Sequence, residues 1–282
     1  MRIIFFGTSE FGVIILEKLV QTGISPVLVV TTPDKPAGRK QILTPSPVKV
    51  FAATHSLEVF QPEKLDQDAI RSIQEKTPDL FIVAAYGKIL PKALLDIPSR
   101  GSLNVHPSLL PKYRGPSPVQ ATILNGDQET GVSIIVLDEK MDHGPILAVD
   151  RFSMQKKYTY SELHNILAEL GGELLIRTIP LWIEGKIQAQ VQDEGKATYA
   201  KILSGEDGRI DWKRPAEYIE RQIRALNPEP GTYTVYREQV LKILKAELSE
   251  GKLVIKEVHL AGKKPMSFED FLRGHQDYVN PQ

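Results

Sequence analysis

The chain has 282 residues, which is long enough for two domains with sizeable cores. Its 35 basic and 35 acidic residues cancel, so the net charge gives no overall attraction to nucleic acid or to an anionic membrane. The absence of cysteine excludes disulfides, thiolate metal ligands and a cysteine nucleophile. No apolar run is long enough for a signal peptide or a membrane span, so we expect a cytoplasmic protein without a membrane partner.

Short apolar runs alternate with helical patterns through the first half of the chain. Near-continuous apolar runs are typical of strands that are buried in a parallel sheet. Between them, residues 11–20 and 49–57 carry apolar side chains at helical spacing. This rhythm predicts an α/β domain with a Rossmann-like, doubly wound, mostly parallel sheet. The expected strands are residues 2–6, 26–30, 79–86 and 102–106.

The region from residue 129 to residue 185 predicts two more strands and a long helix. The two strands flank a loop at residues 138–145. The helix should start near residue 161, where apolar residues begin to follow a helical period. We expect it to be interrupted at Gly171-Gly172 and at Pro180, because glycine and proline are poor helix formers.

The composition changes near residue 204. Residues 204–215 are polar and glycine-rich, which is typical of a linker. A helix is expected at residues 216–226, and the short alternating runs after it predict a small β-barrel or sandwich. We therefore expect two domains: a Rossmann-like domain at residues 1–203, and a short linker helix with a small, OB-like β-barrel at residues 204–282.

The first predicted strand runs into the stretch GTSEFG, residues 7–12, which opens a helix. Phosphates and other anions often bind at such a turn. The stretch lacks the middle glycine of a dinucleotide fingerprint, where Ser9 stands, and Val13 replaces the lysine of a Walker A loop. We interpret it as a tight strand-to-helix turn and expect neither NAD nor ATP there.

A proline-rich, basic loop without a helical or strand period occupies residues 33–49. So long a loop in a compact domain is more often functional than idle. Arg39 and Lys40 follow Gly38, where the backbone can approach a ligand closely. Two interpretations of this loop remain open. In one, its two basic side chains contact phosphate; in the other, the loop is only a solvent-exposed connection.

The stretch SLNVHPSLLPKYRG, residues 102–115, places an amide and an imidazole two residues apart on a predicted strand. Asn104 and His106 should therefore point to the same face of the sheet. Pro107 and Pro111 stiffen the loop that follows. An amide donor beside a titratable ring suits a reaction that builds negative charge on an oxygen while it moves a proton.

Asp142, in the loop at residues 138–145, is a candidate third member of this site. An aspartate that reached His106 would hold the ring in one orientation, but an exposed loop aspartate is often only a turn former. A metal site made of His106, Asp142 and His143 is the alternative. The histidine spacing that is typical of metal sites is missing, so we expect no metal.

The same residues carry a resemblance to a known family. The pattern Asn-x-His-x-Ser-Leu-Leu-Pro, at residues 104–111, is similar to the signature of enzymes that take a formyl group from 10-formyltetrahydrofolate. The catalytic aspartate of that family falls on Asp142. Within this group the chain resembles the methionyl-tRNA formyltransferases over nearly its entire length. The segments that carry this closer resemblance are residues 7–12, 33–49, 84–91 and 197–234.

The resemblance implies a formyltransferase whose catalytic, folate-binding domain is residues 1–203. It would transfer the formyl group of 10-formyltetrahydrofolate to the free amino group of methionyl-initiator tRNA for translation initiation, as a monomer and without a metal. Asn104 would stabilise the oxyanion that forms in this acyl transfer, and His106 would stabilise the same oxygen or protonate the departing nitrogen. Asp142 would orient His106 and accept a proton.

The resemblance also implies binding residues. The inserted loop would hold the acceptor end of the tRNA through Arg39 and Lys40, and residues 204–282 would contact the tRNA as well. The folate would lie against Tyr86, Gly87, Ile89, Leu90, Ser108, Leu109, Leu110 and Pro111.

Two departures from the family pattern bear on the acceptor. Residues 39–43 read RKQIL, so part of the usual positive charge of the inserted loop is missing. The chain also lacks the strands that usually stand between the regions of Lys245 and Lys252. Three alternatives therefore stay open: a formyltransferase for a nucleotide sugar or another small amine, hydrolysis of the formyl folate, and a folate- or RNA-binding module without turnover.

Overall fold

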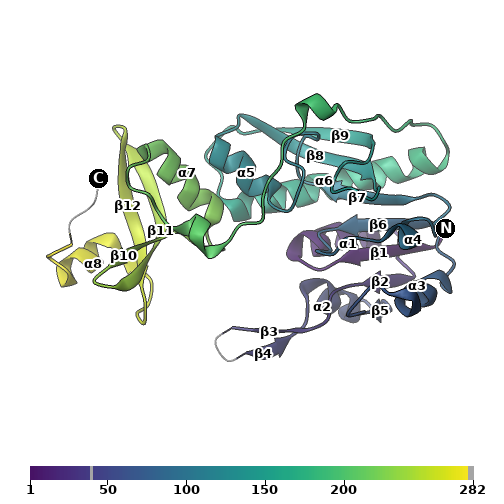
Figure 1. Ribbon diagram of the computed structural model, residues 1–282, viewed down its shortest axis with the longest axis horizontal. Coiled ribbons are helices and arrows are strands. Elements are labelled where there is room, and N and C mark those ends of the chain that lie inside the picture. Colours follow the sequence, from purple (N-terminus) through teal and green to yellow (C-terminus); the bar gives the residue numbers. More distant parts are fainter. Residues whose placement is uncertain (39–40, 279–282) are drawn as a thin grey trace. The chain divides into compact units, whose positions relative to one another are not determined.

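The computed structural model describes residues 1–38 and 41–278 and divides into two compact units (Figure 1). The N-terminal unit consists of Met1–Pro116, Glu129–Phe152 and His164–Tyr199. The C-terminal unit consists of Ser117–Gln128, Ser153–Leu163 and Ala200–Gln282. The domain boundary expected between residues 203 and 204 stays a prediction, because the second unit also takes in two earlier stretches of the chain.

The N-terminal unit is built on a sheet with the strand order β5-β2-β1-β6-β7-β8-β9 (Figure 1). The strands from β5 to β7 run parallel, whereas β8 runs antiparallel to β7. Every residue of β1 and β6 is buried, as expected for strands with helices on both faces. The predicted Rossmann-like, mostly parallel sheet is confirmed. The strands are β1 (Ile3–Gly7), β2 (Leu28–Val30), β5 (Val59–Phe60), β6 (Leu80–Ala84), β7 (Ser102–His106), β8 (Glu129–Val136) and β9 (Ile146–Ser153).

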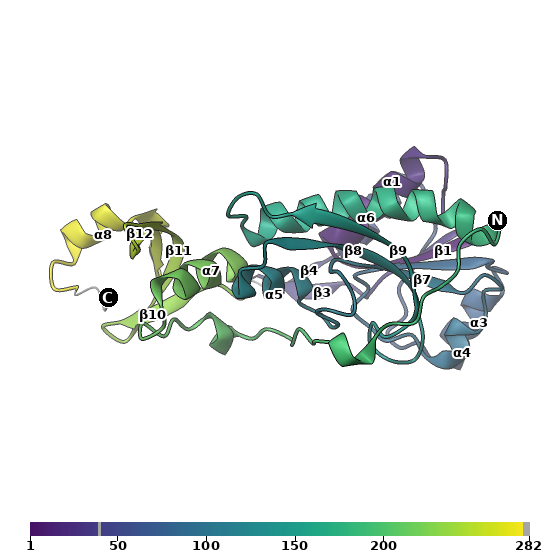
Figure 2. The same cartoon turned by 90° about the horizontal axis from the view of Figure 1, so that it is seen from above.

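Helices cover both faces of this sheet (Figure 2). On one face lie α1 (Glu10–Gln21) and, from residue 164 onward, α6 (Tyr160–Ile183). On the other face lie α3 (Gln67–Gln74) and α4 (Lys92–Leu95). The remaining helix of this unit's first half, α2 (Pro47–Thr54), packs beside α1. Because the helices cover the faces of the sheet, a ligand site is expected at the loops that follow the carboxyl ends of the parallel strands.

The expected interruption of α6 is wrong, because the helix is continuous through Gly171, Gly172 and Pro180. A Cβ on Gly171 would come 2.7 Å from Cγ1 of Val105, so glycine here lets the helix approach β7 closely. Pro180 removes one backbone hydrogen bond, and packing of the buried helix face outweighs that loss. Although α6 has 24 residues, neither it nor any other helix in the described part of the chain is long and apolar enough to cross a membrane.

The inserted segment at residues 33–49 contains regular structure that the sequence did not predict. β3 (Lys35–Ala37) and β4 (Ile42–Thr44) form an antiparallel ribbon. Strands of three residues are too short for their period to be recognised in a sequence. Arg39 and Lys40, the two residues predicted to contact phosphate, lie outside the described residues.

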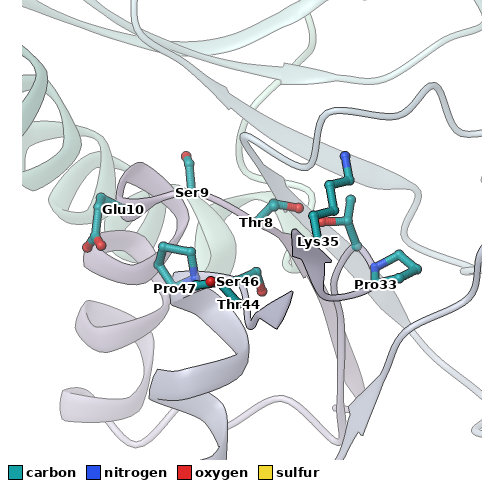
Figure 3. Close-up of a pocket in the computed structure, with 9 residues that line it drawn as sticks. Thr8, Ser9, Glu10, Pro33, Lys35, Thr44, Ser46 and Pro47 are labelled. Atoms are coloured by element: carbon teal, nitrogen blue, oxygen red, sulfur yellow. The ribbon is translucent and has the colours of Figure 1, made fainter. Parts of the chain in front are cut away.

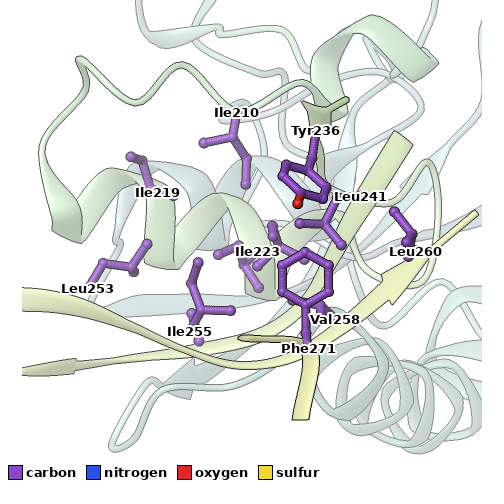
Figure 4. Packing of buried hydrophobic residues seen from close by; sticks show 12 residues of the cluster. Ile210, Ile219, Ile223, Tyr236, Leu241, Leu253, Ile255, Val258, Leu260 and Phe271 are labelled. Carbon is purple, nitrogen blue, oxygen red and sulfur yellow. The ribbon is translucent and has the colours of Figure 1, made fainter. Parts of the chain in front are cut away.

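The C-terminal unit combines helices with an antiparallel sheet of strand order β10-β11-β12-β13. Ile219 and Ile223 of α7 and Phe271 of α8 pack on buried residues of the sheet (Figure 4). The predicted small β-rich domain is confirmed, as an antiparallel meander; among residues 200–278 no pairing of β10 with β13 closes it into the expected barrel. The elements are α5 (Pro118–Asn125), η2 (Gly205–Gly208), α7 (Ala216–Leu226), β10 (Tyr233–Tyr236), β11 (Gln239–Ser249), β12 (Lys252–Leu260), β13 (Met266–Ser267) and α8 (Phe268–Gly274).

Candidate active site

β7 carries Asn104 and His106 on one face of the sheet, where the strand opens into the next loop. The strand is held from both sides, since Val83 of β6 is the register partner of Asn104 and Ser133 of β8 that of His106. His106 is 4 % exposed, so its ring is held inside the protein. The carboxyl ends of strands in open α/β sheets are the usual place for ligand sites.

A backbone carbonyl fixes the hydrogen position on the His106 ring. Nε2 of His106 lies 2.9 Å from the carbonyl oxygen of Tyr113. A carbonyl oxygen can only accept a hydrogen bond, so Nε2 must carry the hydrogen and donate it. Nδ1 is therefore the ring nitrogen that can take up or release a proton.

The carboxylate of Asp142 lies beside both side chains. Its Oδ1 is 3.5 Å from Nδ1 of His106 and 3.4 Å from Nδ2 of Asn104. Its Oδ2 accepts a hydrogen bond of 2.8 Å from the backbone N–H of Gly115. The loop after β8 thus folds back over β7 and brings together the three residues that the sequence indicated. The contact of 3.5 Å is long for a hydrogen bond to Nδ1 of His106, and Nδ2 of Asn104 carries a second hydrogen, so both nitrogens can still bind a substrate.

Three residues around this cluster have a left-handed backbone although none is glycine. The angle φ is 49° at Ala85, 62° at Tyr113 and 48° at Asp142. Ala85 follows β6, Tyr113 lies in the loop after β7, and Asp142 lies in the loop after β8. Such conformations cost about 1–3 kcal/mol each and gather at functional sites, where the surrounding structure holds them. Their grouping here favours a functional site over ordinary turns.

Sequence reasoning missed the groups that hold the cluster in place. They are the carbonyl of Tyr113, the N–H of Gly115 and the side chain of Gln192, whose Nε2 donates to the carbonyl oxygen of Asp142 at 2.8 Å. Backbone groups leave no mark in a sequence. Gln192 lies 50 residues after Asp142 in a stretch without a period or a motif, so no local pattern could have revealed it.

The predicted folate loop after β7 is internally braced. Oγ of Ser108 donates to the carbonyl oxygen of Lys112 at 2.6 Å, and the N–H of Leu110 donates to Oγ of Ser133 at 3.1 Å. The peptide bond between Leu110 and Pro111 is cis. Ser108 and Leu110 are buried, whereas Leu109 and Pro111 are only half-buried. The latter two can therefore meet a ligand, while the former two support the loop.

The second predicted folate segment, residues 86–90, follows β6. Since β6 and β7 are parallel neighbours, the loops after them leave the same edge of the sheet. Tyr86 and Leu90 are buried in the core, and burial raises the pKa of Tyr86 to about 12. Gly87 is exposed and Ile89 is 72 % exposed. Of these four predicted contacts, Gly87 and Ile89 are the ones that the surface offers to a ligand.

The histidine next to Asp142 points into a different set of contacts. Nδ1 of His143 is 2.5 Å from Oδ2 of Asp138, and its Nε2 is 3.5 Å from Oε1 of Glu194. Within residues 1–38 and 41–278, no group of three His, Cys, Asp or Glu side chains could hold a metal ion. The geometry thus does not assemble His106, Asp142 and His143 into a ligand set.

A hollow of about 380 Å³ lies at the turn after β1 (Figure 3). Thr8 and Ser9 of the turn line it, together with Lys35 and Thr44 of the ribbon and Ser46 at the start of α2. The stretch GTSEFG makes the strand-to-helix turn that its sequence predicts. Its polar side chains face a space that is open to solvent, beside the inserted segment.

Comparison with protein families gives two matches that together span most of the chain. The family described as formyl transferase matches residues 1–179, and the formyl transferase C-terminal domain matches residues 202–252. The chain therefore belongs to the formyl transferase family.

Individual relatives show to which group within the formyl transferase family the chain belongs. A protein of Chloroflexus aurantiacus is 48 % identical over 250 residues, which are 88 % of this chain and 81 % of the relative. One from Halalkalibacterium halodurans is 40 % identical and covers 97 % of this chain and 95 % of its own length. Both are named methionyl-tRNA formyltransferase, and at this identity and coverage the chain belongs with the methionyl-tRNA formyltransferases.

Solved structures share the fold. The methionyl-tRNA formyltransferase of Clostridium thermocellum superimposes with a TM-score of 0.64 and 19 % identity, over 92 % of this chain and 98 % of its own. An N-formyltransferase of Helicobacter canadensis, solved with folinic acid and dTDP-3-aminofucose, superimposes with a TM-score of 0.67 and 20 % identity, over 88 % of each chain.

Proposed function

We propose that this protein transfers the formyl group of 10-formyltetrahydrofolate to the amino group of methionyl-initiator tRNA, in the cytoplasm, for the initiation of translation. The names of the relatives support methionyl-tRNA as the acceptor, and the neighbour solved with folinic acid supports a folate as the donor. The observation that carries the chemistry is the position of the Asp142 carboxylate within 3.5 Å of His106 Nδ1 and 3.4 Å of Asn104 Nδ2. An amide donor, a titratable nitrogen and a carboxylate then face one reaction centre.

The first step is attack of the methionyl amine on the formyl carbon. A carbon–nitrogen bond forms, and the electron pair of the formyl C=O moves to oxygen and gives a tetrahedral oxyanion. Nδ2 of Asn104 donates a hydrogen bond to this oxyanion, and loss of such a donor typically raises the barrier by about 2.7–4 kcal/mol. No covalent bond to the enzyme is needed.

The second step breaks the bond between the formyl carbon and the folate nitrogen. The attacking amine must lose a proton and the departing nitrogen must gain one. The Asp142 carboxylate accepts the proton of the amine, directly or through water, and Nδ1 of protonated His106 delivers one to the folate nitrogen. Nε2 cannot take this role, because it donates to the carbonyl of Tyr113. Transfer between His106 and Asp142 then restores the starting state.

The folate lies, in this proposal, against the two loops at the carboxyl ends of β6 and β7. Gly87, Ile89, Leu109 and Pro111 would touch it, and the buried Tyr86, Leu90, Ser108 and Leu110 would keep the loops in shape. Rigid support of this kind lowers the entropy that is lost when the substrate is oriented.

The acceptor end of the tRNA would meet the inserted segment, where Arg39 and Lys40 would neutralise phosphate groups. The C-terminal region, residues 204–282, would contact the rest of the acceptor arm. We propose that the protein acts as a monomer and that the reaction needs no metal.

Removal of single side chains tests this mechanism. Asn104→Ala, His106→Ala and Asp142→Ala should leave a folded protein and lower kcat for formylation of methionyl-tRNA by about 100-fold or more. His143→Ala is the matched control, because this ring contacts Asp138 and Glu194 instead of the cluster, and its kcat should change little. Turnover near the wild-type rate in any of the first three variants would remove that residue from the mechanism.

A further inference from the structure

A buried glutamine holds the backbone of the loop that carries Asp142. Nε2 of Gln192 donates to the carbonyl oxygen of Asp142 at 2.8 Å and to that of Gly144 at 2.7 Å. Both hydrogens of the amide are thereby used. Gln192 is 5 % exposed, so water does not compete for these bonds. They hold Asp142 in a left-handed conformation that an aspartate adopts only at a cost.

Arg114 determines which way the glutamine amide points. Its Nε and Nη2 donate to Oε1 of Gln192 at 3.0 and 2.8 Å. A flipped amide would set its NH₂ group against the guanidinium hydrogens and its oxygen against two carbonyl oxygens. One orientation alone satisfies every partner, with the amide oxygen toward Arg114 and the nitrogen toward the Asp142 loop.

The charge of Arg114 is compensated from the other side. The side chain is 1 % exposed, and a buried charge without a partner is strongly unfavourable. Oε1 and Oε2 of Glu194 accept from Nη2 and Nη1 at 2.6 and 3.0 Å. The hydrogen bond from Arg114 lowers the pKa of Glu194, which keeps this carboxylate charged at neutral pH. A continuous chain of hydrogen bonds thus runs from Glu194 through Arg114 and Gln192 to the backbone of Asp142.

The backbone on either side of Arg114 contacts the same reaction centre. The carbonyl of Tyr113, just before it, accepts from Nε2 of His106, and the N–H of Gly115, just after it, donates to Oδ2 of Asp142. The buried guanidinium therefore anchors residues 113–115 directly. Through Gln192 it also anchors the loop after β8, which carries Asp142. This anchor supports the placement of His106 and Asp142 relative to each other, together with the hydrogen bonds that the N–H groups of Tyr113 and Arg114 donate to Thr198.

We propose that Gln192, oriented by Arg114, is a positioning residue for formyl transfer that sets the backbone of Asp142 and thereby aims its carboxylate at His106 and Asn104. This inference rests on the proposed function. Gln192 itself touches no reacting atom, since both ends of its amide are bonded within the protein. A displacement of about 1 Å at a reaction centre can lower the rate on the order of 100-fold, with little effect on substrate binding.

The substitution Gln192→Glu separates positioning from packing. It keeps the size of the side chain and the acceptor for Arg114, but it sets an oxygen against the carbonyls of Asp142 and Gly144. We expect kcat to fall on the order of 10- to 100-fold while KM for both substrates stays close to the wild-type value. Gln190→Glu is the matched control: the same change on an exposed side chain two residues away should leave both constants unchanged.

A double-mutant cycle shows whether Gln192 acts through Asp142. The cycle uses Gln192→Met, which removes the two amide donors without adding a charge. If circular dichroism shows that Gln192→Glu is unfolded, Gln192→Met also replaces it in the kinetic test. Combined with Asp142→Ala, it should lower kcat no further than Asp142→Ala alone. A full additional loss in the double variant, or wild-type kcat in both Gln192 variants, would overturn the inference and leave the proposed function intact. A wild-type protein without formyl transfer would overturn both.

Discussion

His106 and Asp142 each make one of their polar contacts with the backbone of residues 113–115. The contact to Tyr113 occupies Nε2 of His106, and the contact to Gly115 occupies Oδ2 of Asp142. The remaining atoms, Nδ1 and Oδ1, are left facing each other and Asn104. Backbone partners thus select which atoms of these two side chains can reach a substrate.

A carboxylate at the base of the inserted segment gives a pH-dependent prediction. Hydrogen bonds from Gln61 and from Lys49 lower the pKa of Asp34 below its ordinary value of 3.8. Such a group stabilises the fold above its unfolded pKa and loses that contribution as the pH falls through its folded pKa. Asp34→Asn should therefore be less stable than the wild type in urea at pH 7, and the difference should shrink at about pH 3. An undiminished difference in acid would show that Asp34 acts through shape instead of charge.

At the scale of elements, the approach of α6 to β7 places the reaction centre against a rigid layer. Gly171 lies against Val105, between Asn104 and His106 in the sequence, whereas a Cβ on Gly172 would come 2.9 Å from Cγ and 3.1 Å from Cβ of Lys18 in α1. Neither glycine leaves room for a methyl group, and of the two only Gly171 faces β7.

This difference makes Gly171→Ala and Gly172→Ala a matched pair. Either change gains about 1 kcal/mol of helix propensity. In Gly171→Ala the new methyl would press on the branched, buried Val105, and overpacking costs about 1–3 kcal/mol. In Gly172→Ala the methyl would press on Lys18 of α1 instead, so we expect both variants to lower the urea midpoint and Gly171→Ala alone to lower the kcat of formylation. An unchanged midpoint in Gly171→Ala, or the same kcat in the two variants, would contradict the close packing of α6 on β7.

The elements that sequence reasoning predicted best are those whose pattern is local. The predictions for residues 102–106 and 216–226 coincide with β7 and α7, because a continuous apolar strand and an amphipathic helix are each recognisable within their own length. The interruption of α6 was wrong because tertiary packing overrides the low helix propensity of Gly171.

The residues of the site also differ in how well the sequence could predict them. Asn104, His106 and Asp142 are side chains with recognisable chemistry, so the sequence could indicate them and their contact could be guessed. The support of the cluster could not be predicted, because Gln192 and Arg114 reach it only through contacts between segments far apart in the chain. Their role is defined by hydrogen-bond geometry, which composition and periodicity do not encode.

At the scale of the whole molecule, the balanced charge bears on the acceptor. A protein with zero net charge attracts a polyanion only through local groups, and Arg39 and Lys40 are the candidates in the inserted segment. The neutral residues Gln41 and Ile42 follow them, so we expect the tRNA reaction to depend on salt less steeply than with a fully basic loop.

Loss of one phosphate contact should be visible as a change in this salt dependence. Arg39→Ala should weaken methionyl-tRNA as a substrate and flatten the plot of log kcat/KM against log salt by about one unit or less. Binding of the folate donor by the same variant should be unaffected, because Arg39 lies outside the group of Asn104, His106 and Asp142 in the proposed mechanism. Equal, salt-insensitive rates in the wild type and the variant would argue for a small-molecule acceptor.

The most direct test of the central claim is a product balance for the wild-type protein. It would be mixed with 10-formyltetrahydrofolate and, separately, with methionyl-tRNA, deacylated tRNA, a nucleotide-linked amino sugar or no acceptor. Tetrahydrofolate and formylated acceptor would then be measured together. We predict equal amounts of tetrahydrofolate and formylmethionyl-tRNA with the first acceptor, and neither product with the others. Tetrahydrofolate released without a formylated acceptor, or a formyl group transferred only to the amino sugar, would contradict the account.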